Sequence, residues 1–152
     1  GTMRQYDAIL DSGFSVEFTG CDPYTTSAEL FEDFDQGRMR VFLTDLSALP
    51  IDHPMTAETD YGDLSINDIF RAVHDYHGHC VNRYGFGPIG EDNAYRYHAA
   101  MFPVAALPAL ATETRGQNSW FNYGPHSGKP ASERPFADQK AVAAPNWVIS
   151  AK

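Results

Sequence analysis

The pattern of hydrophobic and polar positions is most regular in residues 66–82. Apolar side chains recur there at helical spacing and share one face, namely Ile66, Ile69, Phe70, Val73, Cys80 and Val81. Ser65 stands directly before this segment and Asp68 follows three residues later, which is a variant of the capping-box signal for a helix start. The pattern therefore predicts a helix over residues 66–82.

Two more helices are expected after this one. Glycine and proline over residues 85–90 break the chain, and residues 91–102 then have the pattern of a helix that ends before Pro103. A third helix is predicted over residues 105–117, where Pro108 is tolerated only near the first turn or at a kink.

The first third of the chain carries shorter patterns. Residues 15–19 alternate like a half-buried strand, and residues 40–44 are a second candidate strand. Between them, Ser27 can cap a short helix that runs through Phe34. Together these patterns predict an α+β fold with a mainly helical core and a small N-terminal sheet.

The remaining segments are irregular. Residues 49–63 carry two prolines and several turn formers, which predicts an ordered loop leading into the functional site. In the tail, residues 118–152, we expect Trp147-Val148-Ile149 to dock as a strand or an anchor. A chain of 152 residues with 43% hydrophobic content is expected to form a single domain over residues 1–152.

The charge and the apolar pattern exclude several classes of protein. A net charge of −9 repels a phosphate backbone or an anionic membrane, which argues against nucleic-acid binding. No apolar run approaches the ~20 residues of a membrane span, and the N-terminus lacks the pattern of a signal segment. Cys21 and Cys80 are too few for a disulfide framework and fit a reducing compartment. We therefore expect a cytoplasmic protein without a membrane partner.

The candidate chemistry begins with His74-Asp75-Tyr76-His77-Gly78-His79. On an ideal α-helix, His74 and His79 lie about 140° apart around the axis, so they do not share a face. Two imidazoles can still converge on one ion above the helix, because Gly78 between them has no side chain. We expect His74 and His79 to be metal ligands; the alternative is a pair of solvated or supporting histidines.

A third ligand is expected from Glu113. This residue shares a predicted helical face with apolar residues such as Leu110, where an unpaired carboxylate is costly to bury. Either a metal ion or an arginine must compensate the charge, and Arg115 and Arg96 are the possible salt-bridge partners. With a metal, His74, His79 and Glu113 form the two-histidine, one-carboxylate set that holds non-haem iron(II) in oxygen-activating enzymes.

Other polar residues lie near these candidate ligands in the sequence. His77 lies on the apolar stripe, and its ordinary interpretation is a core histidine bonded to a carbonyl. His98 shares a face with Glu91 and is a reserve ligand, although a packed, hydrogen-bonded histidine is the simpler interpretation. Asp75 can orient a water molecule or a cofactor beside the metal, or it can be an ordinary solvent-facing carboxylate. The polar end of the third helix, with Gln117 and aromatic residues after it, can line a substrate entrance.

These motifs resemble those of the iron- and pterin-dependent aromatic amino acid hydroxylases. In that family H-E-x-x-G-H supplies two iron ligands and a T-V-E-F-G-type helix supplies a glutamate; the matching positions are His74, His79 and Glu113. The family also carries Asp-Phe shortly before F-R-V-F, and this chain has Asp33-Phe34 shortly before Met39-Arg40-Val41-Phe42. The resemblance covers residues 13–116 and implies a shortened form of the catalytic domain fold.

The resemblance implies Fe(II) and a tetrahydropterin as cofactors. The pterin-stacking phenylalanine of the family falls on Phe34, and its pterin-contacting glutamate falls on Asp75, one methylene shorter. The arginine that binds the substrate carboxylate in the family has no counterpart between Arg40 and Arg71. The resemblance therefore extends to the iron site and not to an amino acid substrate. The same motifs also resemble uncharacterised bacteriophage proteins, which implies an infected host's cytoplasm.

Three functions follow from these residues. The preferred one is a non-haem iron(II) monooxygenase that acts on a small molecule and dioxygen, with Asp75 as a catalytic residue and a reduced pterin near Phe34. The second is a zinc-dependent hydrolase that uses the same three ligands, with Asp75 as general base. The third is a non-enzymatic phage accessory protein in which the metal is structural.

Overall fold

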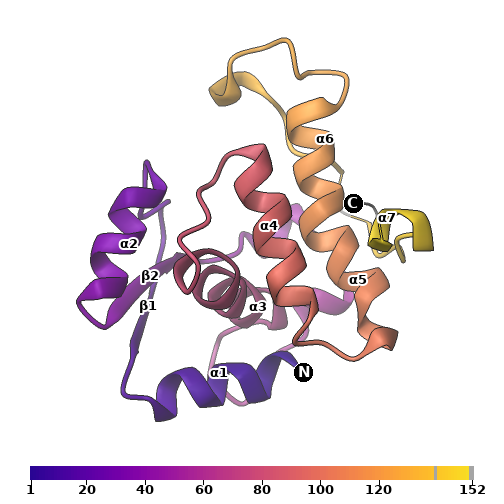
Figure 1. Ribbon diagram of the computed structural model, residues 1–152. Helices are drawn as coiled ribbons and strands as arrows, with labels where there is room; N and C mark the ends of the chain where they lie inside the picture. The colour runs from indigo at the N-terminus through magenta and orange to yellow at the C-terminus, as the bar shows by residue number, and fades with distance from the viewer. Residues whose placement is uncertain (139, 151–152) are drawn as a thin grey trace.

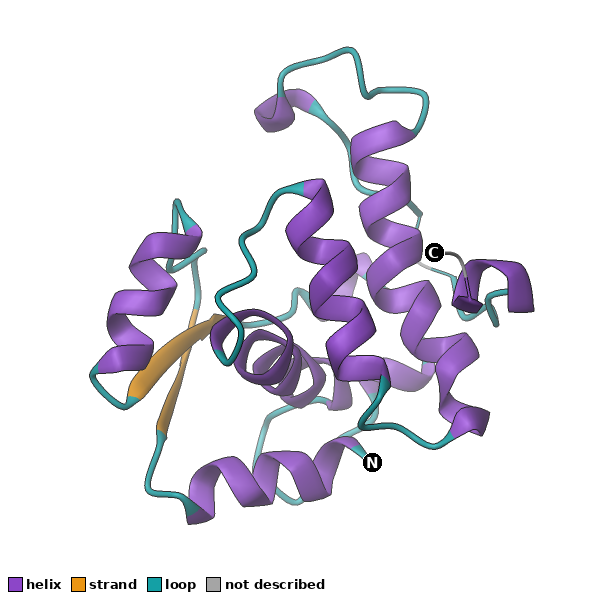
Figure 2. Cartoon of the chain, in the orientation of Figure 1, coloured by secondary structure: helices purple, strands orange, loops and turns teal. Residues whose placement is uncertain are grey.

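The computed structural model describes residues 1–138 and 140–150 (Figure 1). The fold is α+β and mainly helical, with a small parallel sheet at one side (Figure 2), as the sequence predicts. Helix α3 runs through the centre, with the sheet and α2 on one side and α4 to α6 on the other (Figure 1). No helix in the described part of the chain is long and apolar enough to cross a lipid bilayer.

The helices and strands follow one another in a simple order. They are α1 (Thr2–Asp11), β1 (Ser15–Thr19), α2 (Ser27–Asp35), β2 (Arg38–Phe42), α3 (Ile66–His74), α4 (Pro88–Ala99), α5 (Leu107–Ala111), α6 (Gln117–Tyr123) and α7 (Asn146–Ser150). A short 3₁₀ turn at Pro54–Thr56 lies within the predicted loop, and another at Leu46–Ala48 directly precedes it.

The N-terminal sheet has two parallel strands joined by α2. Ser15 of β1 pairs with Arg38 of β2, so β2 begins two residues before the predicted strand. A parallel pair needs a crossover connection, which α2 provides. Thr26, rather than Ser27, is the N-cap residue of α2. Helix α1 was not predicted, and it buries Tyr6 and Ile9 against the core.

Helix α3 begins as predicted and then changes its winding. Ser65 and Asp68 form the reciprocal hydrogen bonds of a capping box. After His74 the backbone continues as a π-helix over Asp75–Cys80, here called the first π segment. The predicted helix is therefore correct in position, and the wider turn at its end is the feature that ideal α-helical spacing missed.

The two later helices also differ from their predictions at the ends. Helix α4 starts at Pro88, three residues earlier than expected, and ends before Pro103. Helix α5 continues through a second π segment, Thr112–Gly116, into α6, so the helical stretch ends six residues later than predicted. Pro108 lies in its first turn, where the absent N–H costs no hydrogen bond.

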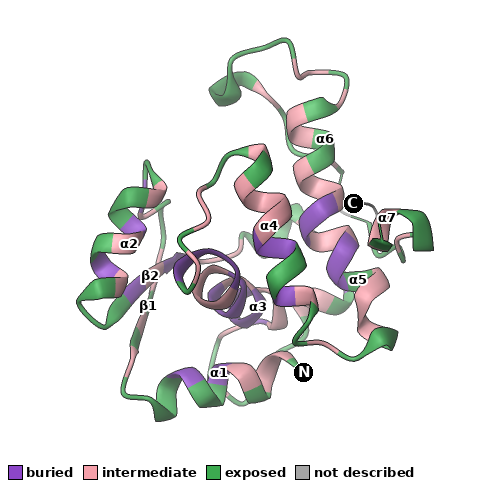
Figure 3. Ribbon diagram, in the orientation of Figure 1, coloured by how far each residue is buried: buried purple, intermediate pink, exposed green. Residues whose placement is uncertain are grey.

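Helix α3 contributes to two hydrophobic clusters. The first cluster includes Ile69 and Val73 and lies against α1 and the sheet. The second includes Phe70 of α3 and Tyr95 of α4, and Val148 and Ile149 pack against it. The buried positions accordingly face α3 from both sides (Figure 3). The tail is thus anchored, as predicted, but by a short helix instead of a strand, with Trp147 74% exposed.

Candidate metal centre

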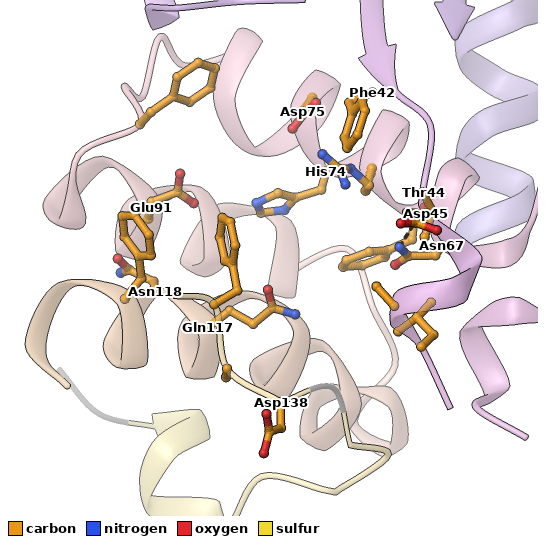
Figure 4. Close-up of a pocket in the computed structure, with 18 of the residues that line it drawn as sticks. Phe42, Thr44, Asp45, Asn67, His74, Asp75, Glu91, Gln117, Asn118 and Asp138 are labelled. Carbon is orange, nitrogen blue, oxygen red and sulfur yellow. Dashed lines mark hydrogen bonds between the residues drawn. The ribbon is translucent and has the colours of Figure 1, made fainter. Parts of the chain in front are cut away.

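Two histidines and a glutamate converge between α3 and α4. One ligand atom each of His74, His79 and Glu91 lies within 4.8 Å of the others, and within the described residues no second group of this kind occurs. His74 ends α3, His79 lies in the first π segment, and Glu91 lies in the first turn of α4. His74 and Glu91 border the same cavity (Figure 4).

The first π segment explains how two histidines five positions apart come together. At its end, the N–H of the C-cap residue Val81 donates to the carbonyl of Tyr76, five residues earlier, and beyond the segment Tyr84 donates to His79 at the same spacing. Such a turn is wider than an α-helical turn, so residues five apart lie closer to one face than they do in an α-helix. The rings of His74 and His79 are accordingly 5.2 Å apart, in an edge-to-face arrangement.

His79 is oriented like a metal-binding imidazole. Its Nδ1 lies 2.8 Å from the carbonyl oxygen of Tyr84, an acceptor, so Nδ1 carries the proton and donates it. Its Nε2 faces Oε2 of Glu91 at 3.4 Å. Burial alone lowers the pKa of His79, but the Glu91 carboxylate outweighs it and the pKa is raised. Two acceptors at this distance need a proton or a metal cation between them, and this requirement fits a metal site.

His74 has the opposite electrostatic environment. Its pKa is held well below the ordinary value, first by burial and then by repulsion from His79 and His98, so the ring is neutral. Its Nδ1 is 3.2 Å from Nδ1 of His98. A neutral imidazole is the form that binds a metal.

His98 and His77 lie behind the centre rather than in it. His98, the reserve ligand, is fully buried and bonds to His74, and burial lowers its pKa to about 3. It is therefore the packed, hydrogen-bonded histidine of the simpler interpretation. His77 stacks near His98, and its buried Nε2 has no hydrogen-bond partner in the described part of the chain. The expected bond of His77 to a carbonyl is therefore not made by Nε2.

Glu113 does not belong to the group that contains His74 and His79. Its half-buried carboxylate accepts a hydrogen bond from Nε2 of Gln117 at 3.3 Å. Burial raises its pKa, and His53 and the Gln117 bond partly offset the rise. The alternative, a salt bridge from Glu113 to Arg96 or Arg115, is not found among the described residues, where both arginines pair with Asp92. The charge of Glu113 is thus met by an amide and a nearby histidine.

Of the two predicted pterin contacts, only Asp75 lines the cavity. Burial raises the pKa of its carboxyl to about 6, so Asp75 is a half-buried carboxylate rather than a solvent-facing one. Phe34 packs instead with Phe14 and Tyr76, and the guanidinium of Arg83 covers it. The structure does not bring Phe34 and Asp75 to one site.

The cavity beside the centre has a volume of about 940 Å³ and is lined by rings and amides. Gln117 lies on its wall, as the sequence predicts for the polar end of the third helix. The other amide and phenylalanine residues around it are Asn67, Asn118, Asn122, Phe42, Phe70, Phe86, Phe121 and Phe136. This space is sufficient for a small organic substrate next to a metal ion.

Sequence reasoning missed Glu91 as a candidate ligand, although one signal pointed to it. Glu91 and His98 are seven positions apart and share a face of α4, so the face that meets His74 carries a carboxylate as well. Comparison with known proteins adds no further assignment: no protein-family model, curated protein or solved structure matches the chain.

Proposed function

We propose that this protein is a non-haem iron(II) monooxygenase in which His74, His79 and Glu91 bind the metal. The observation that supports it is the convergence of two imidazoles and one carboxylate within 4.8 Å beside a large cavity. This donor set leaves coordination positions open on iron(II), which is the arrangement of oxygen-activating enzymes. The resemblance to the hydroxylases also supports oxygen activation by iron(II). On this resemblance alone, we propose that the chain has a shortened form of their catalytic domain fold.

An iron(II) ion at this position supplies activation of dioxygen. The residues of the chain do the remaining work. His79 is held by the carbonyl of Tyr84 so that its Nε2 faces Glu91, and both groups would hold the ion. Asp75 on the cavity wall exchanges protons with the substrate, and the phenylalanines exclude water from it.

We propose a reduced pterin as the reductant, but not stacked on Phe34 as the sequence resemblance implies. The ring of Phe34 already contacts Phe14, Tyr76 and Arg83, so a flat cofactor does not stack there. Asp75 and the phenylalanines of the cavity wall, such as Phe86, are the residues that fit a planar ring close to the centre.

Metal loading of matched variants tests the ligand set. The protein is loaded with Fe(II) without oxygen, and bound iron is measured in wild type, His79→Ala, Glu91→Gln and Glu113→Gln. Wild type and Glu113→Gln are expected to hold stoichiometric iron, and the other two variants to lose most of it. Retained iron in Glu91→Gln with loss in Glu113→Gln contradicts the assignment of Glu91. Oxygen consumption with a reduced pterin then tests the redox activity.

The position of Asp75 favours a second function, zinc-dependent hydrolysis. Its carboxyl lies on the cavity wall next to His74, where a general base can activate a water molecule bound to zinc. A hydrolase works without oxygen, whereas a monooxygenase consumes it. Comparing the zinc-loaded and iron-loaded protein in anaerobic and aerobic buffer therefore separates the two.

A further inference from the structure

A chain of hydrogen bonds runs from α1 to the back of His74. Nδ1 of His74 lies 3.2 Å from Nδ1 of His98, and Nε2 of His98 lies 2.9 Å from Oε1 of Gln5. Nε2 of Gln5 in turn donates to the backbone carbonyl of Met101 at 3.3 Å. Three helices, α1, α3 and α4, thus contribute a side chain to one continuous path.

The carbonyl of Met101 fixes the direction of this path. A backbone carbonyl only accepts, so the amide nitrogen of Gln5 must face Met101 and the amide oxygen must face His98. The reversed amide would place two oxygens against each other at 3.3 Å. Because Oε1 of Gln5 also only accepts, Nε2 of His98 carries a proton.

The other nitrogen of His98 is then an acceptor. His98 is 0% exposed, its ring neighbours include Phe70 and Phe102, and within the described residues no carboxylate forms an ion pair with it. A doubly protonated ring would be a buried, unpaired cation, which is strongly unfavourable. Neutral His98 therefore accepts at Nδ1, and His74 must donate from its own Nδ1. The Nε2 of His74 is left with a free lone pair.

We propose that Gln5 and His98 are positioning residues that hold His74 in the Nδ1–H tautomer, with Nε2 available to a metal ion. The carbonyl of Tyr84 imposes the same tautomer on His79 by a separate contact. Both imidazoles are thus prepared to bind through Nε2 before the ion arrives. Only the identity of the ion that His74 and His79 bind rests on the proposed function.

The tautomers can be measured directly in the metal-free protein. Long-range ¹H–¹⁵N spectra of the full ¹⁵N-labelled chain distinguish the two nitrogens of each neutral histidine. We expect His98 as the Nε2–H form and His74 as the Nδ1–H form. A His74 that carries its proton on Nε2 overturns the proposal.

Variants of Gln5 test whether the path sets the tautomer. Gln5→Met removes the acceptor at similar volume, and both tautomers of His98 and of His74 are then expected to appear. Co(II) affinity, followed by visible absorption, is expected to fall about 10- to 100-fold, as when other partners of ligating histidines are removed. Unchanged tautomers and unchanged affinity in Gln5→Met overturn the proposal.

A control on the same helix separates positioning from stability. Ile9 is 2% exposed on α1 and is not part of the path, so Ile9→Val is expected to lower the unfolding temperature without changing either tautomer. A tautomer change in Ile9→Val would mean that general packing, and not Gln5, sets the proton position. If the tautomers are as expected and Co(II) does not bind, the proposed function fails and the positioning role stands.

Discussion

At the scale of single residues, Gly78 determines how closely α4 approaches the histidines. A Cβ at this position would lie 3.1 Å from Cε1 of His74 and 3.2 Å from Cβ of Ala94. Gly78→Ala must therefore displace the imidazole or the helix, and we expect a loss of about 1–3 kcal/mol in the free energy of unfolding. Urea denaturation of the metal-free protein measures this change.

Gly116 offers a matched control in the second π segment. Its backbone is helical, and a Cβ there would meet only the carbonyl oxygen of Ala111, at an ordinary 3.4 Å. Gly116→Ala is expected to leave stability unchanged or raise it by up to about 1 kcal/mol, because alanine favours a helix. Equal losses in the two variants would show that the effect at Gly78 is not steric.

The residues of the centre divide into those that local sequence can identify and those that it cannot. His74 and His79 stand in one short motif, so their proximity needs only the local winding of one helix. The carboxylate comes from another helix, and the choice between Glu91 and Glu113 depends on how α3, α4 and α5 pack. Residue spacing contains no information about that packing. The predicted burial of Glu113 suggested that its carboxylate needs a metal ion or an arginine, but Gln117 supplies a hydrogen bond instead.

At the scale of elements, Asp33 joins α2 to β2. It is 6% exposed, and it accepts hydrogen bonds from Tyr24 at 3.0 Å, Arg38 at 3.1 Å and Arg40 at 3.0 Å. Burial alone raises the pKa of Asp33, but these donors outweigh it and the pKa is lowered. The stabilisation is therefore complete above the unfolded-state pKa of about 3.9 and is lost as the pH falls through the lower folded-state pKa.

Replacement of Asp33 tests this dependence on pH. Asp33→Asn is expected to lower the free energy of unfolding by about 1–3 kcal/mol at neutral pH, since bonds to a charged acceptor are lost. The difference from wild type should shrink as the pH is lowered through the folded-state pKa. Denaturant curves at several pH values measure both quantities, and a difference that grows at low pH contradicts the assignment.

Asp35 provides the comparison on the same helix. It also pairs with an arginine, Arg83, but its side chain is 63% exposed. An exposed pair of this kind contributes little in water. Asp35→Asn is therefore expected to change stability by less than about 0.5 kcal/mol at any pH.

Element ends with local chemical signals were predictable, and changes of winding were not. Ser65 and Asp68 mark the start of α3, and Pro108 marks the first turn of α5, because capping uses neighbouring residues. The π segments, Asp75–Cys80 and Thr112–Gly116, carry no comparable capping signal. Helix α1 did carry a sequence signal, namely the three-residue spacing of Met3, Tyr6 and Ile9. A single short apolar stripe is nevertheless weak evidence for a helix.

At the scale of the whole molecule, the centre lies where the two hydrophobic clusters meet. Helix α3 contributes Val73 to one cluster and Phe70 to the other, and His74 follows directly. Glu91 approaches from α4, which belongs to the second cluster through Tyr95. An ion held by both helices would therefore join the parts of the protein that contain the two clusters.

Metal binding should consequently stabilise the entire fold. An ion that binds only the folded chain adds about 2.7 kcal/mol when its free concentration is about 100 times Kd. For a protein of this size, that energy corresponds to a rise of about 5–10 °C in the unfolding temperature. Calorimetry with Co(II), and again after a chelator is added, measures the rise and its reversal. Glu113→Gln should show the full rise, because Glu113 lies outside the centre, and Glu91→Gln should show little of it. A full rise in Glu91→Gln would place the ion elsewhere in the molecule and remove the basis for oxygen chemistry between α3 and α4.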